Sequence, residues 1–378
     1  MSQLSVWEKE SFFAPQDVII IGSGFAGLWS ALKLLEKNSR LKITILERGI
    51  IPTGASTRNA GFSCFGSPSE LLHDIEMMGE EKTWQVVGMR YKGLHEIRKY
   101  FSDAVIDYDA SGGYECFREG SADWELSAAK LDWLNERLQA ITNLKNTFTI
   151  ADEKLSTFGF KGFAHLIESE LEGGLHSGKF VQALLQKVQG MGVQVLTGVE
   201  VKSYHLENGM VKVISNQNID FSTKKLLLCT NAFTKSLLPD IDITPNRGQV
   251  LLTNAIDHLK LKGTFHFDQG YYYFRNLGNR ILIGGARNKS FKEEETTEIA
   301  TTGIIQNELE DFVRQHLLPN TAFTVTDRWS GIMAMGNEKL PIVKAINEQV
   351  FCCVRMNGMG VALSPVVAEQ IAALITAS

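Results

Sequence analysis

The sequence predicts an α/β fold, α+β overall, in which a domain built on a parallel sheet is interleaved with a domain built on an antiparallel sheet. Near the amino terminus, an apolar strand, a glycine-rich turn, a helix and a second strand follow one another over residues 17–47, which is the order of a βαβ unit. Comparable segments recur in the middle and at the end of the chain, and strand-like segments rich in Tyr and Phe lie between them. This order predicts two domains that alternate along the chain.

The elements of the first half follow from hydrophobic period and turn residues. The first strand is expected over 17–21, because its β-branched apolar run ends in glycine, as a buried parallel strand does. The elements expected after it are a helix over 28–37, a strand over 41–47, a helix over 67–100 with weak points at Gly79 and Gly88, a strand pair over 105–117 that turns at 111–113, and helices over 124–143 and 178–192.

The second half is richer in strands. The segment Glu207-Asn-Gly209 is a strong hairpin signal between two of them. The elements expected here are strands over 193–196, 199–206, 210–215 and 225–229, strand-like text over 247–288 with a turn at 277–280, a helix over 293–318, strands over 322–335 and 349–355, and a final apolar helix over 360–377.

Composition excludes several classes of protein. The net charge is −5 and no basic stripe is present, so nucleic-acid binding has no electrostatic support. No stretch predicts a membrane span, and the first residues lack the features of a signal peptide. The five cysteines match no CxxC framework and the histidines show no metal spacing. We therefore expect reduced thiols, no metal site and a cytoplasmic protein.

The most specific local pattern is Gly-Ser-Gly-Phe-Ala-Gly at residues 22–27, which reads Gly-x-Gly-x-x-Gly between a strand and a helix. Glycines there permit a tight turn and let a pyrophosphate approach the helix N-terminus. Glu47, at the end of the second strand, is placed to accept hydrogen bonds from ribose hydroxyls and disfavours a 2′-phosphate. We expect a Rossmann-like dinucleotide-binding domain. A turn needed only for packing is the alternative, and the motif alone does not separate NAD from FAD.

Two features favour FAD. The chain holds no second glycine motif for a separate nicotinamide cofactor. Residues 54–61, Gly-Ala-Ser-Thr-Arg-Asn-Ala-Gly, form a loop of small residues soon after the second strand, where a large flat ring can approach main-chain amides.

Five segments, in order, resemble the D-amino-acid oxidase (DAO) superfamily of FAD-dependent amine oxidoreductases. They are the turn at 22–27, Glu47-Arg48 with 54–61, Gly-Leu-His-Ser-Gly-Lys-Phe at 174–180, Leu-Cys-Thr-Asn-Ala at 228–232, and Asn-Gly-Met-Gly-Val-Ala-Leu-Ser-Pro at 357–365. The resemblance covers nearly the whole chain. Arg-Asn-x-Gly at 58–61 and Tyr-Tyr-Phe-Arg at 272–275 are most similar to the gamma-glutamylputrescine oxidoreductase branch, beside the glycine oxidase and sarcosine oxidase branches.

The resemblance implies an FAD-binding domain of residues 1–75, 151–245 and 325–378, and a substrate-binding domain of residues 76–150 and 246–324. It places the adenosine end at Glu47 and Arg48, the adenine at the main chain of Val201, and the pyrophosphate region at Thr230 and Asn231. The start of the last helix would direct its dipole at the negative charge of reduced flavin, although a tight strand–helix turn is the alternative. The expected cofactor-binding residues are Gly22, Ser23, Gly24, Phe25, Ala26, Gly27, Glu47, Arg48, Ser56, Thr57, Arg58, Asn59, Ala60, Gly61, Val201, Thr230, Asn231, Gly331, Asn357, Gly358, Met359, Gly360 and Val361.

Candidate catalytic residues are Tyr272, Arg275 and Arg58, with Arg328 as a lesser candidate. Tyr272 matches a tyrosine that lines the substrate cavity in several members of the superfamily, and packing within an aromatic strand is the alternative. Arg275 stands where members often have proline. It can bind a substrate carboxylate bidentately, or it is a solvated arginine at a strand end.

The sequence also departs from the superfamily. Residues 331–334, Gly-Ile-Met-Ala, replace the Gly-x-Arg-Pro segment that anchors the carboxylate in D-amino-acid and glycine oxidases. Leu282 and Ala362 stand where monomeric sarcosine oxidase has lysines, and residues 332–335 hold no cysteine for a covalent flavin. We therefore expect non-covalent FAD and a substrate other than a simple α-amino acid.

The resemblance implies an enzyme that oxidises a primary or secondary amine, or an amino-acid derivative, to an imine by hydride transfer to flavin N5, with reoxidation by O2. Two alternatives stay open, namely a flavin dehydrogenase that passes electrons to a quinone or carrier, and a non-catalytic flavin-binding assembly protein. The sequence names neither the substrate nor the oligomeric state.

Overall fold

The computed structural model describes residues 4–217 and 219–377. The chain divides into two compact units: the first is Met1–Thr57, Gly178–Pro245 and Met333–Ser378, and the second is Arg58–Ser177 and Asn246–Ile332. Residues 58–75, 151–177 and 325–332, which the sequence assigns to the cofactor domain, pack in the second unit, because their strands pair within its sheets. The compact units therefore differ from the predicted domain boundaries in these three stretches.

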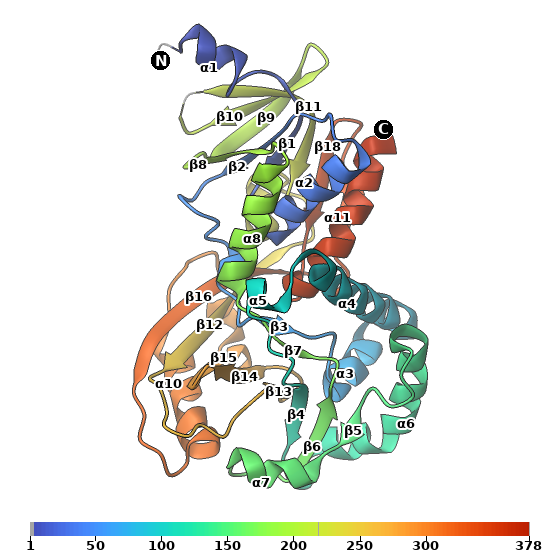
Figure 1. The fold of residues 1–378 in the computed structure, drawn as a ribbon, viewed down its shortest axis with the longest axis vertical. Helices are drawn as coiled ribbons and strands as arrows, with labels where there is room; N and C mark the ends of the chain where they lie inside the picture. The colour runs from blue at the N-terminus through green and yellow to red at the C-terminus, as the bar shows by residue number, and fades with distance from the viewer. Residues whose placement is uncertain (1–3, 218, 378) are drawn as a thin grey trace. The chain divides into compact units, whose positions relative to one another are not determined.

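A twisted sheet forms the centre of the first unit (Figure 1). Its strands are β1 (Gln16–Ile21), β2 (Ile43–Glu47), β8 (Gln194–Thr197), β9 (Val201–Glu207), β10 (Met210–Ser215), β11 (Asp220–Leu228), β17 (Ile342–Ala345) and β18 (Val350–Val354). The order is β17-β18-β11-β1-β2-β8, and β18, β11, β1, β2 and β8 run parallel. The predicted hairpin at 207–209 joins β9 to β10, which pairs with β11.

Helices α2 (Phe25–Lys37), α8 (Ser177–Gly190) and α11 (Gly360–Ala377) belong to the first unit, as does the short α1 (Val6–Glu10). Helices α2 and α11 lie side by side (Figure 1). By length and composition α11 is apolar enough to cross a membrane, but it packs on α2, β17 and β18 and most of it is buried, as in a core helix.

The second unit is built on another sheet, with strand order β16-β12-β15-β14-β13-β4-β6-β5. Its strands are β4 (Gly113–Phe117), β5 (Thr149–Ile150), β6 (His165–Ser169), β12 (Thr244–Thr253), β13 (Thr264–Phe267), β14 (Tyr272–Leu277), β15 (Arg280–Gly285) and β16 (Val325–Met335). A separate small ladder joins β3 (Phe62–Ser63) to β7 (Gly173–Gly174). Its helices are α3 (Pro68–Met78), α4 (Glu80–Tyr100), α5 (Asp103–Ile106), α6 (Ala122–Thr142), α7 (Leu155–Phe158), α9 (Phe291–Glu294), α10 (Gly303–Phe312) and the π-helical turn η5 (Val313–Leu317).

The two faces of this sheet differ in what covers them. One face, which we call the helix face, carries Phe265, Tyr272 and Phe274 and packs in one apolar cluster with Leu309 and Phe312 of α10. On the opposite face, which we call the loop face, Val250 and Leu282 form a second cluster with Ala60 from the predicted flavin loop. Because side chains alternate along a strand, every residue of β14 belongs to one face or the other.

Two predicted elements are wrong in detail, and the strand β6 was missed. Residues 105–117 do not form a strand pair, since α5 ends at Ile106 and β4 pairs instead with β13 and β6. The single helix expected over 293–318 is divided into α9, α10 and η5. Strand β6 was not predicted, although it lies between β4 and β5.

Candidate functional site

Four segments that the sequence singles out follow neighbouring parallel strands of the first unit. The turn at 22–27 follows β1, Glu47 ends β2, Thr230 follows β11, and residues 357–361 follow β18. The carboxyl ends of neighbouring parallel strands share one edge of a sheet, which is where ligands bind in open α/β folds. The structure therefore brings these predicted residues together.

The glycine turn is shaped for close approach of main chain. Gly22 has a φ of +102°, and a Cβ there would lie 2.8 Å from the carbonyl oxygen of Cys229. A Cβ on Gly27 would lie 2.0 Å from the carbonyl oxygen of Gly22. Gly24 caps the N-terminus of α2 without a side-chain hydrogen bond of its own. Ser23, Phe25 and Ala26 complete the turn and the start of α2, whose N–H groups and dipole favour an anion.

Glu47 holds the turn in place. Its carboxylate is buried and accepts hydrogen bonds from the main-chain N–H of Ser23 at 3.0 Å, from the Ser23 hydroxyl at 2.7 Å and from the N–H of Gly49 at 2.9 Å. The carbonyl of Glu47 accepts from the N–H of Val199, which places the nearby Val201 at the start of β9 next to the end of β2. The guanidinium of Arg48 lies 3.7 Å from the ring centroid of Phe233.

Small residues after β2 also reach this turn. The hydroxyl of Ser56 accepts from the N–H of Phe25 at 2.9 Å, so it caps the first turn of α2. The hydroxyl of Thr57 donates to the carbonyl of Pro52 at 2.7 Å, which closes the loop.

The residues that follow β11 and β18 at the same sheet edge have left-handed backbone conformations. Asn231 has a left-handed φ of +45°, and its buried Oδ1 has no hydrogen-bond partner among the described residues. Asn357 and Gly358 have φ values of +48° and +80°, and they direct the chain from β18 into α11. Met359, Gly360 and Val361 follow at the N-terminus of that helix, where the first N–H groups have no intrahelical acceptor.

These features fit a bound dinucleotide. The turn at residues 22–27 leaves no room for a Cβ at Gly22 or Gly27, the helices α2 and α11 both begin after strands of this sheet, and the buried Oδ1 of Asn231 lacks a donor among the described residues. A pyrophosphate and ribose would supply the anion and the hydroxyl donors that this edge lacks.

The other predicted cofactor residues, 58–61 and Gly331, lie in the second unit. Arg58 is hydrogen-bonded to β16. Its Nη1 donates to the carbonyl of Ser330 at 3.0 Å, and its main-chain carbonyl accepts from Trp329 Nε1 at 3.0 Å. Gly331 is buried in β16, directly after Ser330. The Oδ1 of Asn59 accepts from the N–H of Gly61 at 2.8 Å. The predicted flavin loop is thus held rigidly on the loop face.

Arg275 fixes the end of this loop. It is 4% exposed, and its Nη1 donates to the carbonyls of Gly61 at 2.6 Å and Leu175 at 3.0 Å. Gly61 has a φ of +72°, and a Cβ on Gly174 would lie 2.2 Å from the guanidinium. These contacts show neither a solvated arginine nor one that is open to a carboxylate. Arg275 joins two main-chain segments instead.

Tyr272 lies on the helix face, away from the flavin loop. Its ring stacks on Phe312 with centroids 4.8 Å apart, and its hydroxyl donates to Glu308 Oε1 at 2.6 Å. Burial is the main cause that raises the pKa of this hydroxyl far above its ordinary value, and the hydrogen bond to Glu308 raises it further. Since Tyr272 and Arg275 are an odd number of residues apart in one strand, they belong to opposite faces.

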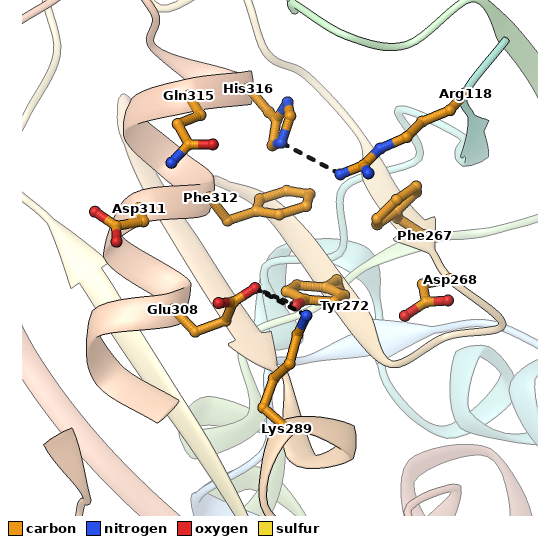
Figure 2. A pocket seen from close by; sticks show the side chains of 10 residues that line it. All are labelled: Arg118, Phe267, Asp268, Tyr272, Lys289, Glu308, Asp311, Phe312, Gln315 and His316. Atoms are coloured by element: carbon orange, nitrogen blue, oxygen red, sulfur yellow. Dashed lines mark hydrogen bonds and ion pairs between the residues drawn. The ribbon is translucent and has the colours of Figure 1, made fainter. Parts of the chain in front are cut away.

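Tyr272 does line a cavity, of about 270 Å³, on that helix face (Figure 2). Around it Lys289 lies 3.6 Å from Glu308, and Arg118 approaches the ring of His316 at 3.5 Å (Figure 2). Five of the polar groups that line it, those of Tyr272, Glu308, Lys289, Arg118 and His316, interact with one another. Arg328 also points its Nη1 and Nη2 at residues of α10, namely Gln306 and Glu310.

Tyr273, which the sequence analysis missed, is the tyrosine on the loop face. It pairs across the ladder with Gly284, and a Cβ on that glycine would lie 2.5 Å from the tyrosine ring. Phe62, next to the flavin loop, makes edge-on contacts with Tyr273 at 5.8 Å and with His266 at 5.2 Å. The alternation Tyr-Tyr-Phe-Arg indicates only that Tyr272 and Phe274 share one face and that Tyr273 lies on the other, and the packing of Tyr272 and Phe274 with Phe312 shows which face is the core.

A buried polar cluster lies behind these aromatic rings. Glu172 Oε2 is 3.9 Å from Nε2 of His266, which has no hydrogen-bond partner among the described residues. Burial lowers the pKa of His266 to about 4 and raises the pKa of Glu172 to about 7. The imidazole is therefore neutral near pH 7. Within residues 4–217 and 219–377, no group of three or more His, Cys, Asp or Glu side chains has a metal-binding arrangement.

Comparisons with known proteins agree with this geometry. Residues 17–374 match the model of the DAO family, described as FAD dependent oxidoreductase. The "Probable oxidoreductase OrdL" of Haemophilus influenzae is 23% identical over 95% of this chain and 82% of its own length. The crystal structure of L-proline dehydrogenase from P. horikoshii has a TM-score of 0.76 at 17% identity, covering 96% of this chain and 94% of that one. Glycine oxidase from Bacillus cereus has a TM-score of 0.73 at 18% identity, covering 96% and 95%. Since the family model spans nearly the whole sequence, the chain belongs to the FAD-dependent oxidoreductases of the DAO family and has FAD as its cofactor.

Proposed function

We propose that this protein oxidises a primary or secondary amine, or an amino-acid derivative, to the imine, with O2 as the electron acceptor. One observation carries the proposal: residues 58–61, which the family resemblance assigns to the flavin, lie on the same sheet face as Tyr273. FAD, when bound, supplies the acceptor of the hydride that leaves the carbon next to nitrogen.

The side chains of the loop face suit an uncharged amine. Phe62 and Tyr273 present aromatic surface, and Leu282 is buried beside them in the ladder. Burial raises the pKa of Tyr273 to about 12, so its hydroxyl is neutral, and His266 is neutral as well. Aromatic surface and neutral polar groups disfavour the ammonium form, and the positive charge of Arg287, which acts on Tyr273, works in the same direction. Both effects free the nitrogen lone pair that amine oxidation requires.

The names of proteins with similar structures support the substrate class. They include an L-proline dehydrogenase, a glycine oxidase and an iminodiacetate oxidase. Each name specifies an amino or imino compound. For the present chain we propose the class of substrate only, together with non-covalent FAD and a cytoplasmic location.

The apolar Leu282 favours one second candidate. By the family resemblance, the lysine that activates oxygen in monomeric sarcosine oxidase falls near Leu282, which is 5% exposed in an apolar cluster. A dehydrogenase that passes electrons to a quinone or carrier is therefore the alternative. Reoxidation of the reduced enzyme in air separates the two, because an oxidase returns rapidly to its yellow form and releases peroxide.

The proposal is tested by an anaerobic bleaching screen of the purified flavoprotein with amino acids, N-methyl amino acids and polyamine derivatives. We expect bleaching of the flavin absorbance by at least one amine. Failure of every amine would reject the proposal and leave a non-catalytic flavin-binding role. Flavin that stays with the polypeptide after acid precipitation would contradict the non-covalent FAD.

A further inference from the structure

His266 and Glu172 form a buried pair of titratable side chains to which the proposed reaction has so far given no part. The two residues are 6% and 2% exposed. Nε2 of His266 has no hydrogen-bond partner among the described residues, and Oε2 of Glu172 lies 3.9 Å from it. A movement of about 1 Å by either side chain would bring the two atoms into hydrogen-bond contact. A buried polar atom that is left unpaired costs stability, so its presence here indicates a function.

The strand registers place His266 beside the tyrosine of the proposed substrate side. His266 in β13 pairs with Tyr273 in β14, which pairs in turn with Gly284, so the three positions share the loop face. Phe62, which follows the predicted flavin loop, makes edge-on contacts with both the imidazole and the phenol ring. The imidazole therefore brings a neutral, basic nitrogen to the face on which we place the amine.

An amine that arrives as its ammonium form has to lose a proton before hydride transfer, and most polar groups of this face are unsuited to accept it. Arginine side chains have no acceptor atom. Burial raises the pKa of Tyr273 to about 12, so its hydroxyl already carries a proton. Glu115, which pairs with His266 from β4, accepts from the N–H of Ser69 at 2.9 Å and from the hydroxyl of the same serine. The unpartnered nitrogen of His266 remains as an acceptor.

Glu172 is suited to hold the proton afterwards. Burial raises the pKa of its carboxyl to about 7 and lowers the pKa of His266 to about 4, so a proton on the imidazole moves on to the carboxylate. Its Oε1 accepts from the N–H groups of Phe65 and Gly66, which leaves Oε2 directed at His266. The other charged and titratable groups around the pair are Arg90 of α4, Glu70 of α3, Cys64, Tyr108 and Glu115. Arg90 opposes the rise in the pKa of Glu172, but burial outweighs it.

We infer that the imidazole of His266 receives the proton that the substrate ammonium loses, and that Glu172 is the positioning residue that holds this proton. In this step an N–H bond of the ammonium breaks and an N–H bond forms on the imidazole, whose Nε2 proton then passes to Oε2 of Glu172. The net change converts an ammonium and a carboxylate into a neutral amine and a carboxylic acid, with no electron transfer. The inference rests on the proposed function and deepens it, because it makes amine oxidation depend on an ionised Glu172.

The test measures the limiting rate of anaerobic flavin bleaching at saturating amine between pH 5 and pH 8. The proteins are the FAD-loaded wild type, Glu172→Gln, His266→Gln and the control Glu170→Gln, which makes the same change at an exposed position. The wild-type rate should rise roughly 100-fold over this range with a midpoint near 7, because the carboxylate has to be ionised to accept the proton. Glu172→Gln and His266→Gln should be slower at pH 8 and lose this rise, whereas Glu170→Gln should keep it. Two amines of different basicity separate the titration of the enzyme from that of the substrate, because only the latter moves with the amine.

A second readout does not need turnover. The ring nitrogens of His266, observed by NMR in protein with isotope-labelled histidine and assigned with His266→Gln, report whether a carboxyl donates to Nε2. In the wild type the Nε2 signal should shift as the pH passes through about 7, where Glu172 loses its proton, and in Glu172→Gln it should not.

Two results would overturn the inference while amine oxidation stands. One is a rise of the bleaching rate with pH that persists in Glu172→Gln, and the other is an Nε2 signal of the wild type that does not change between pH 5 and pH 8. If no amine bleaches the flavin, the proposed function fails, and the NMR titration then decides whether His266 and Glu172 share a proton.

Discussion

Glu172 provides a quantitative test of the buried cluster behind the loop face. The side chain is 2% exposed, and its Oε1 accepts from the N–H of Phe65 at 2.8 Å and from the N–H of Gly66 at 3.4 Å. Burial raises the pKa of the carboxyl to about 7, from an ordinary value of 4.5, although these hydrogen bonds and Arg90 oppose the rise. The folded protein therefore keeps a proton that the unfolded chain releases between those two values. Stability falls as the pH rises through this window.

The size of the effect follows from the two pKa values. With 7 in the folded state and 4.5 in the unfolded chain, the carboxyl destabilises the fold by about 1 kcal/mol at pH 5 and about 3 kcal/mol at pH 8. The substitution Glu172→Gln keeps an oxygen that can accept the same N–H bonds but has no proton to release. Glu172→Gln should therefore abolish a decrease of about 2 kcal/mol in the free energy of unfolding between pH 5 and pH 8. For a chain of 378 residues this corresponds to about 3 °C in Tm.

Thermal unfolding followed by near-ultraviolet circular dichroism measures this effect. The quantity of interest is the Tm of Glu172→Gln minus the Tm of wild type, which should increase from pH 5 to pH 8. The titration of His266 runs in the opposite direction, and because its pKa is about 4 in the folded protein and its ordinary value is 6.5, most of its effect lies below pH 7. Glu170→Gln is the matched control, because it makes the same change two residues away at an exposed position. A Tm difference that is the same at both pH values would refute the reasoning.

Three further predictions concern the cofactor and the substrate. Gly27→Ala should yield protein without flavin, seen as loss of the visible absorbance bands, because its Cβ would lie 2.0 Å from a main-chain oxygen. Arg275→Met should lower the Tm by several degrees and reduce FAD occupancy, because two buried carbonyls lose charged donors at a cost of about 3 kcal/mol. Tyr273→Phe should change the rate of anaerobic bleaching, whereas Tyr272→Phe should leave that rate unchanged and lower only stability; the reverse pattern would place the substrate on the helix face.

Local sequence patterns were sufficient to predict most helices and strands of the first unit. The β1–α2–β2 unit is contiguous in sequence, so its hydrophobic periods and its glycine turn specify it without knowledge of distant partners. The hairpin at 207–209 and helix α11 are local in the same sense. Strand β6 is different, because its short segment is a strand through its pairing with β5 and with β4, which is about fifty residues away in the chain. The strand pair predicted over 105–117 was wrong for a related reason. The glycine pair that resembles a hairpin turn leads into β4, a strand whose partners are distant in the chain.

The candidate site shows the same division between local and distant information. The glycine turn and Glu47 were predictable because one motif contains both their chemistry and their geometry. The substrate side of the site could not be predicted, because the sequence does not indicate which face of β14 packs on α10. Phe274 and Tyr272 share the cluster with Phe312, and only that contact assigns Tyr273 to the other face. A shift of one residue in the assignment exchanges the whole set of side chains between core and site.

The contrast between Arg275 and Arg287 explains why an arginine in a motif is weak evidence for a substrate anchor. Arg275, in β14, is enclosed by the main chain that it joins, so a substrate carboxylate would have to compete with two carbonyls. Arg287 lies in the short turn η4 (Arg287–Lys289) after β15, where its Nη1 donates to the side-chain amide of Asn246 at 2.9 Å and no main-chain carbonyl accepts from its guanidinium among the described residues. The energetic gain from binding an anion is larger where no internal acceptor has to be displaced. Burial and existing partners, not residue type or motif, therefore decide whether an arginine is free to bind a substrate carboxylate.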